Sequence, residues 1–245
     1  TEIYTLSLHD ALPILFDIRT EGTGELLARL DEGRGVLLFG SHLGSFDALR
    51  ALGRQRPDLK LRVLLDRGHN AAITELLAEL DPGLAAGIID AGQGGPAVVL
   101  AIQQALQEGA MVALLVDRAR PGETALAAPL LGTPAPFPTA PWLIASVLKA
   151  PVMLAFGLYR GGNRYDLLFE PFATAVDVPR AQRAEALSAL VHRYAGRLEH
   201  HLRGAPWNWF NFYDFWHSQA SLPAPPDGSG AAGRLDQRAG DGGRR

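Results

Sequence analysis

A histidine and an aspartate five positions apart, His42 and Asp47, are the residues of this chain best suited to chemistry. They lie in Gly-Ser-His-Leu-Gly-Ser-Phe-Asp, between an apolar run at 35–39 and a helical pattern at 47–54. This order predicts a strand, a tight turn and a helix, so His42 should lie at the carboxyl end of a strand, where open α/β sheets bind ligands. Asp47 follows about one and a half helical turns later, so its carboxylate can reach back and orient the imidazole as a general base. Gly44 would leave room for a substrate.

The spacing of this pair does not by itself establish catalysis. In the alternative interpretation, Ser41 caps the helix and His42 makes an ordinary hydrogen bond. The segment 40–44 is also similar to a nucleophile elbow, but its central residue is histidine rather than serine, so that interpretation fails. The chain contains no cysteine, which excludes thiol catalysis, disulfides and cysteine-based zinc sites.

The positions that carry this chemistry depend on a sheet that the rest of the sequence predicts. Apolar runs at 36–39, 61–65, 87–90 and 111–116 predict strands, and helical patterns occur at 26–30, 46–54, 71–80 and 96–107. A helix at 140–148, a strand pair at 152–159 and 164–169, and a long helix at 180–203 should follow. This alternation is typical of βαβ units, so we expect an α/β fold, a mainly parallel central sheet flanked by helices in a single domain.

Length, charge and composition set limits on function. The 245 residues suit one domain, and the formal net charge of −3 argues against nucleic-acid binding. No run of about 20 apolar residues predicts a transmembrane helix. Residues 1–14 resemble a translated sequencing adapter, so we expect a non-native leader there, a domain at 15–221, and a disordered tail at 222–245, where nine of 24 residues are Gly or Pro.

Several motifs together resemble the lysophospholipid acyltransferase-like superfamily, and in particular its branch of bacterial lipid A biosynthesis (lauroyl/myristoyl) acyltransferases. The resemblance covers about residues 33–216. Besides the segment that holds His42 and Asp47, it depends on Val116-Asp117-Arg118, Leu131-Gly132-Thr133-Pro134-Ala135, Phe137-Pro138 and Trp-Phe-Asn-Phe-Tyr-Asp-Phe-Trp at 209–216.

The resemblance implies a glycerolipid-acyltransferase-like fold and an enzyme that moves a fatty acyl group from a thioester to a hydroxyl or amine of a lipid or glycolipid. Acyl carrier protein or acyl-CoA would carry the donor, and no cofactor, metal or covalent acyl-enzyme is expected. His42 would deprotonate the acceptor, with Asp47 orienting it. The enzyme would act as a peripheral protein at the cytoplasmic face of the bacterial inner membrane, its native amino-terminal membrane segment missing here. A thioesterase or lipase using the same histidine, and a non-catalytic lipid-binding module, remain as alternatives.

Two further strand ends carry residues to which the resemblance gives a role. Arg67 follows the strand at 61–65 and Arg118 follows the strand at 111–116, so both should open onto the edge that holds His42. Both are candidates for binding acceptor phosphate, and Arg118 could instead polarise the thioester carbonyl. Asp117 would order Arg118 through a charge-assisted bond, and Glu123 is a further candidate on the next loop. An arginine or backbone amides must hold the oxyanion, and the sequence does not say which.

Three other features have a structural and a functional interpretation. Seven aromatic residues at 207–216 suit either a lid packed on the core or a belt at the membrane interface. The apolar run at 142–156 could form a wall for the acyl chain. His192, Glu199, His200 and His201 share one helix without a His-Glu-x-x-His pattern, so we expect a solvated face rather than metal ligands.

Overall fold

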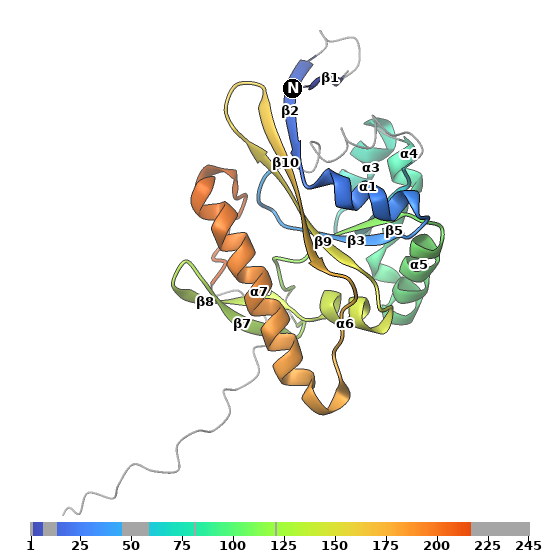
Figure 1. Ribbon diagram of the computed structural model, residues 1–245, viewed down its shortest axis with the longest axis vertical. Helices are drawn as coiled ribbons and strands as arrows, with labels where there is room; N and C mark the ends of the chain where they lie inside the picture. Colours follow the sequence, from blue (N-terminus) through green and yellow to red (C-terminus); the bar gives the residue numbers. More distant parts are fainter. Residues whose placement is uncertain (1, 7–13, 46–58, 81, 121, 217–245) are drawn as a thin grey trace, which may run out of the picture.

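An eight-stranded sheet forms the centre of the computed structural model, which describes residues 2–6, 14–45, 59–80, 82–120 and 122–216 (Figure 1). The strand order is β1-β2-β10-β9-β3-β6-β4-β5, and five of the seven pairings are parallel. The strands are β1 (Glu2–Leu6), β2 (Ile14–Glu21), β3 (Val36–Gly40), β4 (Leu61–Leu65), β5 (Ile88–Asp90), β6 (Met111–Leu115), β9 (Val152–Tyr159) and β10 (Arg164–Ala173).

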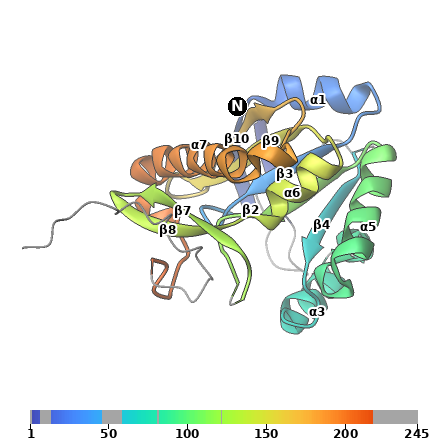
Figure 2. The same cartoon turned by 90° about the horizontal axis from the view of Figure 1, so that it is seen from below.

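Helices flank this sheet, and a two-stranded hairpin lies beside the longest helix. The helices are α1 (Thr23–Asp31), α3 (Ala71–Leu80), α4 (Pro82–Ala86), α5 (Gly95–Gln107), α6 (Ala140–Val147) and α7 (Arg183–Gly204), and the hairpin is β7 (Ala125–Leu130) with β8 (Thr133–Pro138). Short 3-10 turns occur at Ala91–Gln93, Arg180–Gln182 and Pro206–Asn208. Figure 2 shows α3 and α5 at the β4 end of the molecule, with α7 and the hairpin at the other end.

The core has two layers because successive side chains of a strand point to opposite faces of the sheet. On β3, Leu37 and Phe39 pack with α5, α6 and α7, whereas Val36 and Leu38 pack with α1. All four side chains are at most 4% exposed. A strand buried on both faces reads as a continuous apolar run, which explains why β3 and β6 were visible in the sequence.

The predicted fold class is confirmed: the sheet is mainly parallel and flanked by helices. The strands at 61–65 and 152–159 and the helix at 71–80 have the predicted bounds, and most other elements differ by one to four residues at an end. β2, α4 and the β7–β8 hairpin were not predicted from the sequence. The helix predicted at 46–54 lies outside the described residues.

The predictions for the two ends of the chain, a non-native leader and a disordered tail, are not tested by the structure. Within the expected leader, Glu2–Leu6 forms an edge strand that pairs antiparallel with β2, and β2 pairs parallel with β10. That 1–14 is a non-native leader stays a prediction. The predicted tail, 222–245, lies outside the described residues.

Candidate active site

The side chain of His42 lies against the carboxylate of Asp117, 75 residues later in the chain. β3 and β6 are neighbouring parallel strands, and Gly40 pairs with Leu115 at their carboxyl ends. Two residues further along each strand, Nδ1 of His42 is 2.8 Å from Oδ1 of Asp117, and the backbone N–H of His42 donates to Oδ2 at 3.0 Å. The carboxylate is fully buried, whereas the imidazole keeps 28% of its surface exposed. The carboxylate is thus closed to solvent, whereas the imidazole ring can be reached from outside.

This pairing corrects the expected role of Asp117, which was to order Arg118. Both carboxylate oxygens of Asp117 bind His42. Arg118 instead donates from Nε to Oδ1 of Asn211 at 2.7 Å and from its terminal nitrogen to the carbonyl of Phe210. Asp47, the predicted partner of His42, lies outside the described residues, so its role stays a prediction.

A buried tyrosine supports the turn that carries His42. The hydroxyl of Tyr194, on α7, donates to the carbonyl of Gly40 at 3.1 Å. Burial raises the pKa of Tyr194 well above its ordinary 10, and the negative charge of Asp117 raises it further. The hydroxyl therefore stays protonated and holds the end of β3 by hydrogen bonding.

The backbone amides around His42 are all engaged. The N–H of Leu43 donates to Oγ of Ser41, that of Gly44 to the carbonyl of Asn208, and that of Ser45 to the carbonyl of Gly157. Together with the bond from His42 to Asp117, this leaves no amide at 42–45 free to hold an oxyanion.

The structure requires glycine at position 44 for a different physical reason from the expected one. Its φ is +89°, and a Cβ at this position would lie 2.2 Å from the carbonyl oxygen of Gly157. The loop after β3 passes so close to β9 that only glycine fits. The space at Gly44 is taken by the protein's own backbone, where we expected it to be open to substrate.

A second charged cluster lies where β4 ends, but Arg67 is not part of it. The guanidinium of Arg67 is exposed and donates to the carbonyl of Ala85 in α4. Asp66 instead accepts from Arg120 at 2.8 Å and contacts His69 at 3.0 Å. The backbone N–H of His69 is the main cause that lowers the pKa of Asp66.

Glu123 belongs to the same cluster, because its carboxylate accepts from the backbone N–H of Arg120 at 3.0 Å. Arg120 was not predicted, although it follows Asp117 by three residues on the same sheet edge. Its signal in the sequence was the repeated arginine in Asp-Arg-Ala-Arg.

Two aromatic residues of the predicted acyl-chain wall at 142–156 belong to the core. Trp142 and Phe156 are 0% and 1% exposed, and Trp142 packs edge-on against Phe39 and Tyr194. These side chains therefore form core. An apolar hollow of about 350 Å³ lies instead beside the carboxyl-terminal segment, lined among others by Leu131, Leu202, Pro206, Trp209, Phe215 and Trp216.

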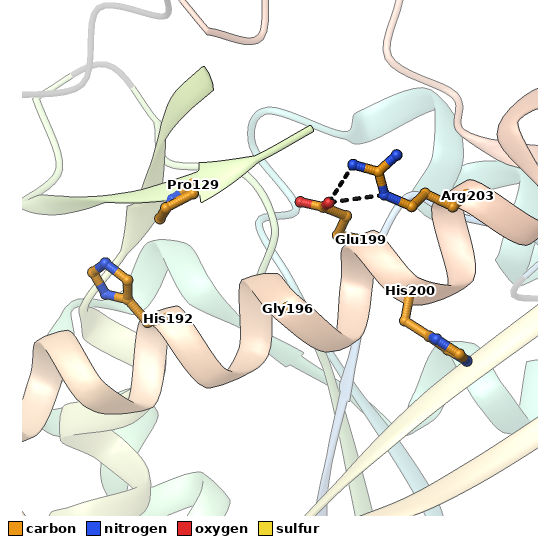
Figure 3. Close-up of a pocket in the computed structure, with 6 residues that line it drawn as sticks. All are labelled: Pro129, His192, Gly196, Glu199, His200 and Arg203. Atoms are coloured by element: carbon orange, nitrogen blue, oxygen red, sulfur yellow. Dashed lines mark hydrogen bonds and ion pairs between the residues drawn. The ribbon is translucent and has the colours of Figure 1, made fainter. Parts of the chain in front are cut away.

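The four polar residues of α7 do not form one solvated face. His201 is 8% exposed, and its Nε2 lies 2.6 Å from Glu170 on β10, which also binds Arg197. The other three line an open hollow of about 390 Å³, where Glu199 pairs with Arg203 and His200 points away from that pair (Figure 3). Within the described part of the chain, no group of three His, Asp or Glu side chains is arranged to hold a metal ion.

The fold agrees with a comparison to known families. Residues 7–218 match the model of the bacterial lipid A biosynthesis acyltransferase family. The match spans most of the chain, so the protein belongs to this family and is an acyltransferase that acts on lipid. No individually curated protein matches the chain. Among the described residues, no helix is both long and apolar enough to cross a membrane.

Proposed function

We propose that the protein transfers a fatty acyl group from an acyl thioester to a hydroxyl or amine of a lipid or glycolipid, with His42 as the general base. The observation that carries the proposal is the 2.8 Å contact between Nδ1 of His42 and the buried carboxylate of Asp117. A carboxylate on one ring nitrogen fixes the proton there, so the other nitrogen, Nε2, keeps its lone pair for the acceptor. Asp47, which was predicted to orient His42, lies outside the described residues, so that role stays a prediction.

In the reaction, Nε2 removes the proton from the acceptor as the acceptor oxygen or nitrogen attacks the thioester carbonyl. Asp117 stabilises the imidazolium that forms. The tetrahedral intermediate then expels the thiolate, which takes the proton back from Nε2 and leaves His42 neutral again. Proton transfer by a positioned group contributes about 10²–10⁴-fold in rate. No covalent acyl-enzyme is needed, in keeping with the absence of cysteine.

Arg118 is the candidate for holding the oxyanion or the acceptor phosphate. It is half-buried beside Asp117, and its two bonds to Asn211 and Phe210 use two of the five N–H donors of a guanidinium. The remaining N–H donors can face the negative charge that develops on the carbonyl oxygen. Stabilisation of that charge by fixed donors is usually the largest single contribution to catalysis of this kind. We further propose acyl carrier protein rather than CoA as the carrier of the donor. We also propose that the protein acts at the cytoplasmic face of the bacterial inner membrane.

The proposal is tested by incubating the protein with a bacterial lipid extract and either acyl-carrier-protein thioester or acyl-CoA, each labelled in the acyl chain. Acylated lipid should form with the wild type and not with His42→Ala. His192→Ala is the matched control, because it removes an exposed histidine on α7. Free fatty acid as the only product would indicate a hydrolase, and bound but unchanged donor would indicate a binding module.

A further inference from the structure

Four aromatic side chains stand out from the surface between α7 and the end of the described chain. Trp207 and Phe212 are 93% and 90% exposed, and Phe210 and Tyr213 are 49% and 44% exposed. We call these four residues the aromatic rim. They supply four of the ten exposed large hydrophobic side chains in the described residues, all within seven positions. Scattered apolar side chains are ordinary on a surface, whereas a group of them marks an interaction site. Within the rim, the ring centroids of Phe210 and Phe212 lie 6.3 Å apart.

The rim is exposed although the segment that carries it is well packed. The neighbouring aromatics point inward: Phe215 is 2% exposed, and its ring lies 4.8 Å from that of Trp209, edge to face. Trp216 packs against both. The segment thus has an inner side that belongs to the core and an outer side that the fold leaves uncovered.

This segment is also fixed directly to the catalytic turn. The backbone N–H of Phe210 donates to the carbonyl of His42 at 2.9 Å, and the N–H of Gly44 donates to the carbonyl of Asn208 at 2.8 Å. Arg118, the residue after Asp117, holds the same segment through Asn211 and Phe210. Whatever contacts the rim is therefore held at a set position relative to the imidazole.

We propose that the aromatic rim docks on the surface of a lipid bilayer, with Trp207 and Phe212 reaching headgroup depth. The inference rests on the proposed function, because an acceptor that is a lipid presents its reactive group in that plane. Trp and Tyr favour this depth, since each has an apolar ring and a polar group that stays hydrated. Docking there brings His42 to the acceptor without extraction of the lipid.

Co-sedimentation with vesicles of phosphatidylcholine, with and without phosphatidylglycerol, tests this surface. Trp207→Ser combined with Phe212→Ser should weaken vesicle binding about tenfold or more, at the scale of withdrawing two large apolar side chains from an apolar environment. The matched control is Leu100→Ser with Val147→Ser, which removes two side chains that are 64% and 71% exposed on α5 and α6. The control should bind like the wild type.

A second measurement keeps the test valid if the serine variant folds poorly. Trp207→Phe should keep vesicle binding but lose most of the fluorescence quenching by brominated phosphatidylcholine, because Trp142, Trp209 and Trp216 lie partly or fully inside the protein. Quenching that persists in Trp207→Phe would contradict insertion of this residue.

The outcomes separate this inference from the proposed function. His42→Ala should bind vesicles like the wild type while forming no product. Rim-dependent binding without any acyl transfer by the wild type would leave the inference standing and remove the proposed function. If the wild type transfers the acyl group but its vesicle binding is unchanged by the rim substitutions, or if it does not bind vesicles, the inference would be overturned. Rim-dependent self-association in place of vesicle binding would overturn it as well, because the occupant would then be a second copy of the chain.

Discussion

Replacement of Asp117 by asparagine should lower kcat/KM for acyl transfer by about 10³ and leave the fold in place. Asp117 uses both of its oxygens on one residue, Oδ1 on the ring nitrogen of His42 and Oδ2 on its backbone N–H. Asparagine has the same shape but only one acceptor oxygen. If that oxygen keeps the backbone bond, the amide NH₂ faces Nδ1 and favours the tautomer protonated on Nε2. That tautomer cannot accept the proton of the acceptor.

The magnitude follows from the charge that the substitution removes. During the reaction the imidazole becomes positive, with Nδ1 2.8 Å from a carboxylate oxygen and the two charges centred about 4 Å apart. At an effective dielectric constant of about 20, this attraction amounts to about 4 kcal/mol. Because about 1.4 kcal/mol corresponds to a factor of ten in rate, its loss slows the reaction by about 10³.

Steady-state transfer from a labelled thioester, with a thermal melt on the same preparation, checks this expectation. The matched control is Asp66→Asn, which changes a buried carboxylate at the end of the neighbouring strand β4. Its ring partner, His69, is 84% exposed, so the rate should fall less than about tenfold. If Asp117→Asn melts normally and keeps more than a tenth of the wild-type kcat/KM, Asp117 only shapes the turn, and the base is oriented by another group.

Three further predictions concern the surroundings of the site. Gly44→Ala should destabilise the protein by about 3 kcal/mol or more in denaturant titration, because its Cβ would meet the carbonyl of Gly157 at 2.2 Å, whereas Gly132→Ala, at φ +85° with open space around it, should cost about 1–2 kcal/mol. Arg118→Ala should impair catalysis more than Arg67→Ala in steady-state kinetics, because only Arg118 lies beside the histidine–carboxylate pair; the reverse ranking would contradict the assignment. Burial raises the pKa of Glu170, but His201 and Arg197 outweigh it and lower this pKa from 4.5 to about 2, so the stabilisation is present above about pH 4.5 and disappears as the pH falls towards 2. Glu170→Gln should therefore have a lower free energy of unfolding than the wild type at pH 6. The difference between the two proteins should shrink as the pH falls from 4.5 to 2, and a difference that does not change with pH would contradict this linkage.

The sequence predicted those elements whose pattern has one dominant physical cause. β3 and β6 are buried on both faces, so they read as continuous apolar runs, and α5 and α7 carry one apolar face at helical spacing. Their positions required no knowledge of their neighbours. Even so, the apolar face of α7 did not reveal that the side chain of His201 contacts Glu170, since that contact depends on where β10 lies.

The β7–β8 hairpin was missed because its residues conflict with strand propensities. Its strands contain alanines and four prolines, and proline removes a donor from the ladder. A two-stranded ribbon tolerates this because each strand has an unpaired edge. The turn signal was also incomplete: Leu131 and Gly132 both have positive φ, as a two-residue hairpin turn requires, but leucine rarely adopts that conformation.

Whether the carboxylate beside His42 could have been found depends on strand order. A nearby acid such as Asp47 can be evaluated from helix geometry alone, whereas Asp117 requires knowing that β3 lies next to β6. Once Gly40 is paired with Leu115, counting two residues along each strand places His42 opposite Asp117. Counting succeeds here because the backbone segments after β3 and β6 continue side by side past the last paired residues. The hydrogen bond from the N–H of Val116 to the carbonyl of Gly40 shows this.

The same count fails one strand away, and the failure explains why Arg67 is not at the site. Val63 pairs with Ala113, so counting four residues onward from each of them would set Arg67 opposite Asp117. The chain instead turns directly after Asp66: the N–H of Arg67 donates to the side chain of Asp90, and that of Asn70 donates to the carbonyl of Asp66. Arg67 is carried towards α4, and Arg120 reaches Asp66 from the β6 side. Strand register therefore predicts a site residue only as far as the backbone stays extended, which holds for Asp117 and not for Arg67.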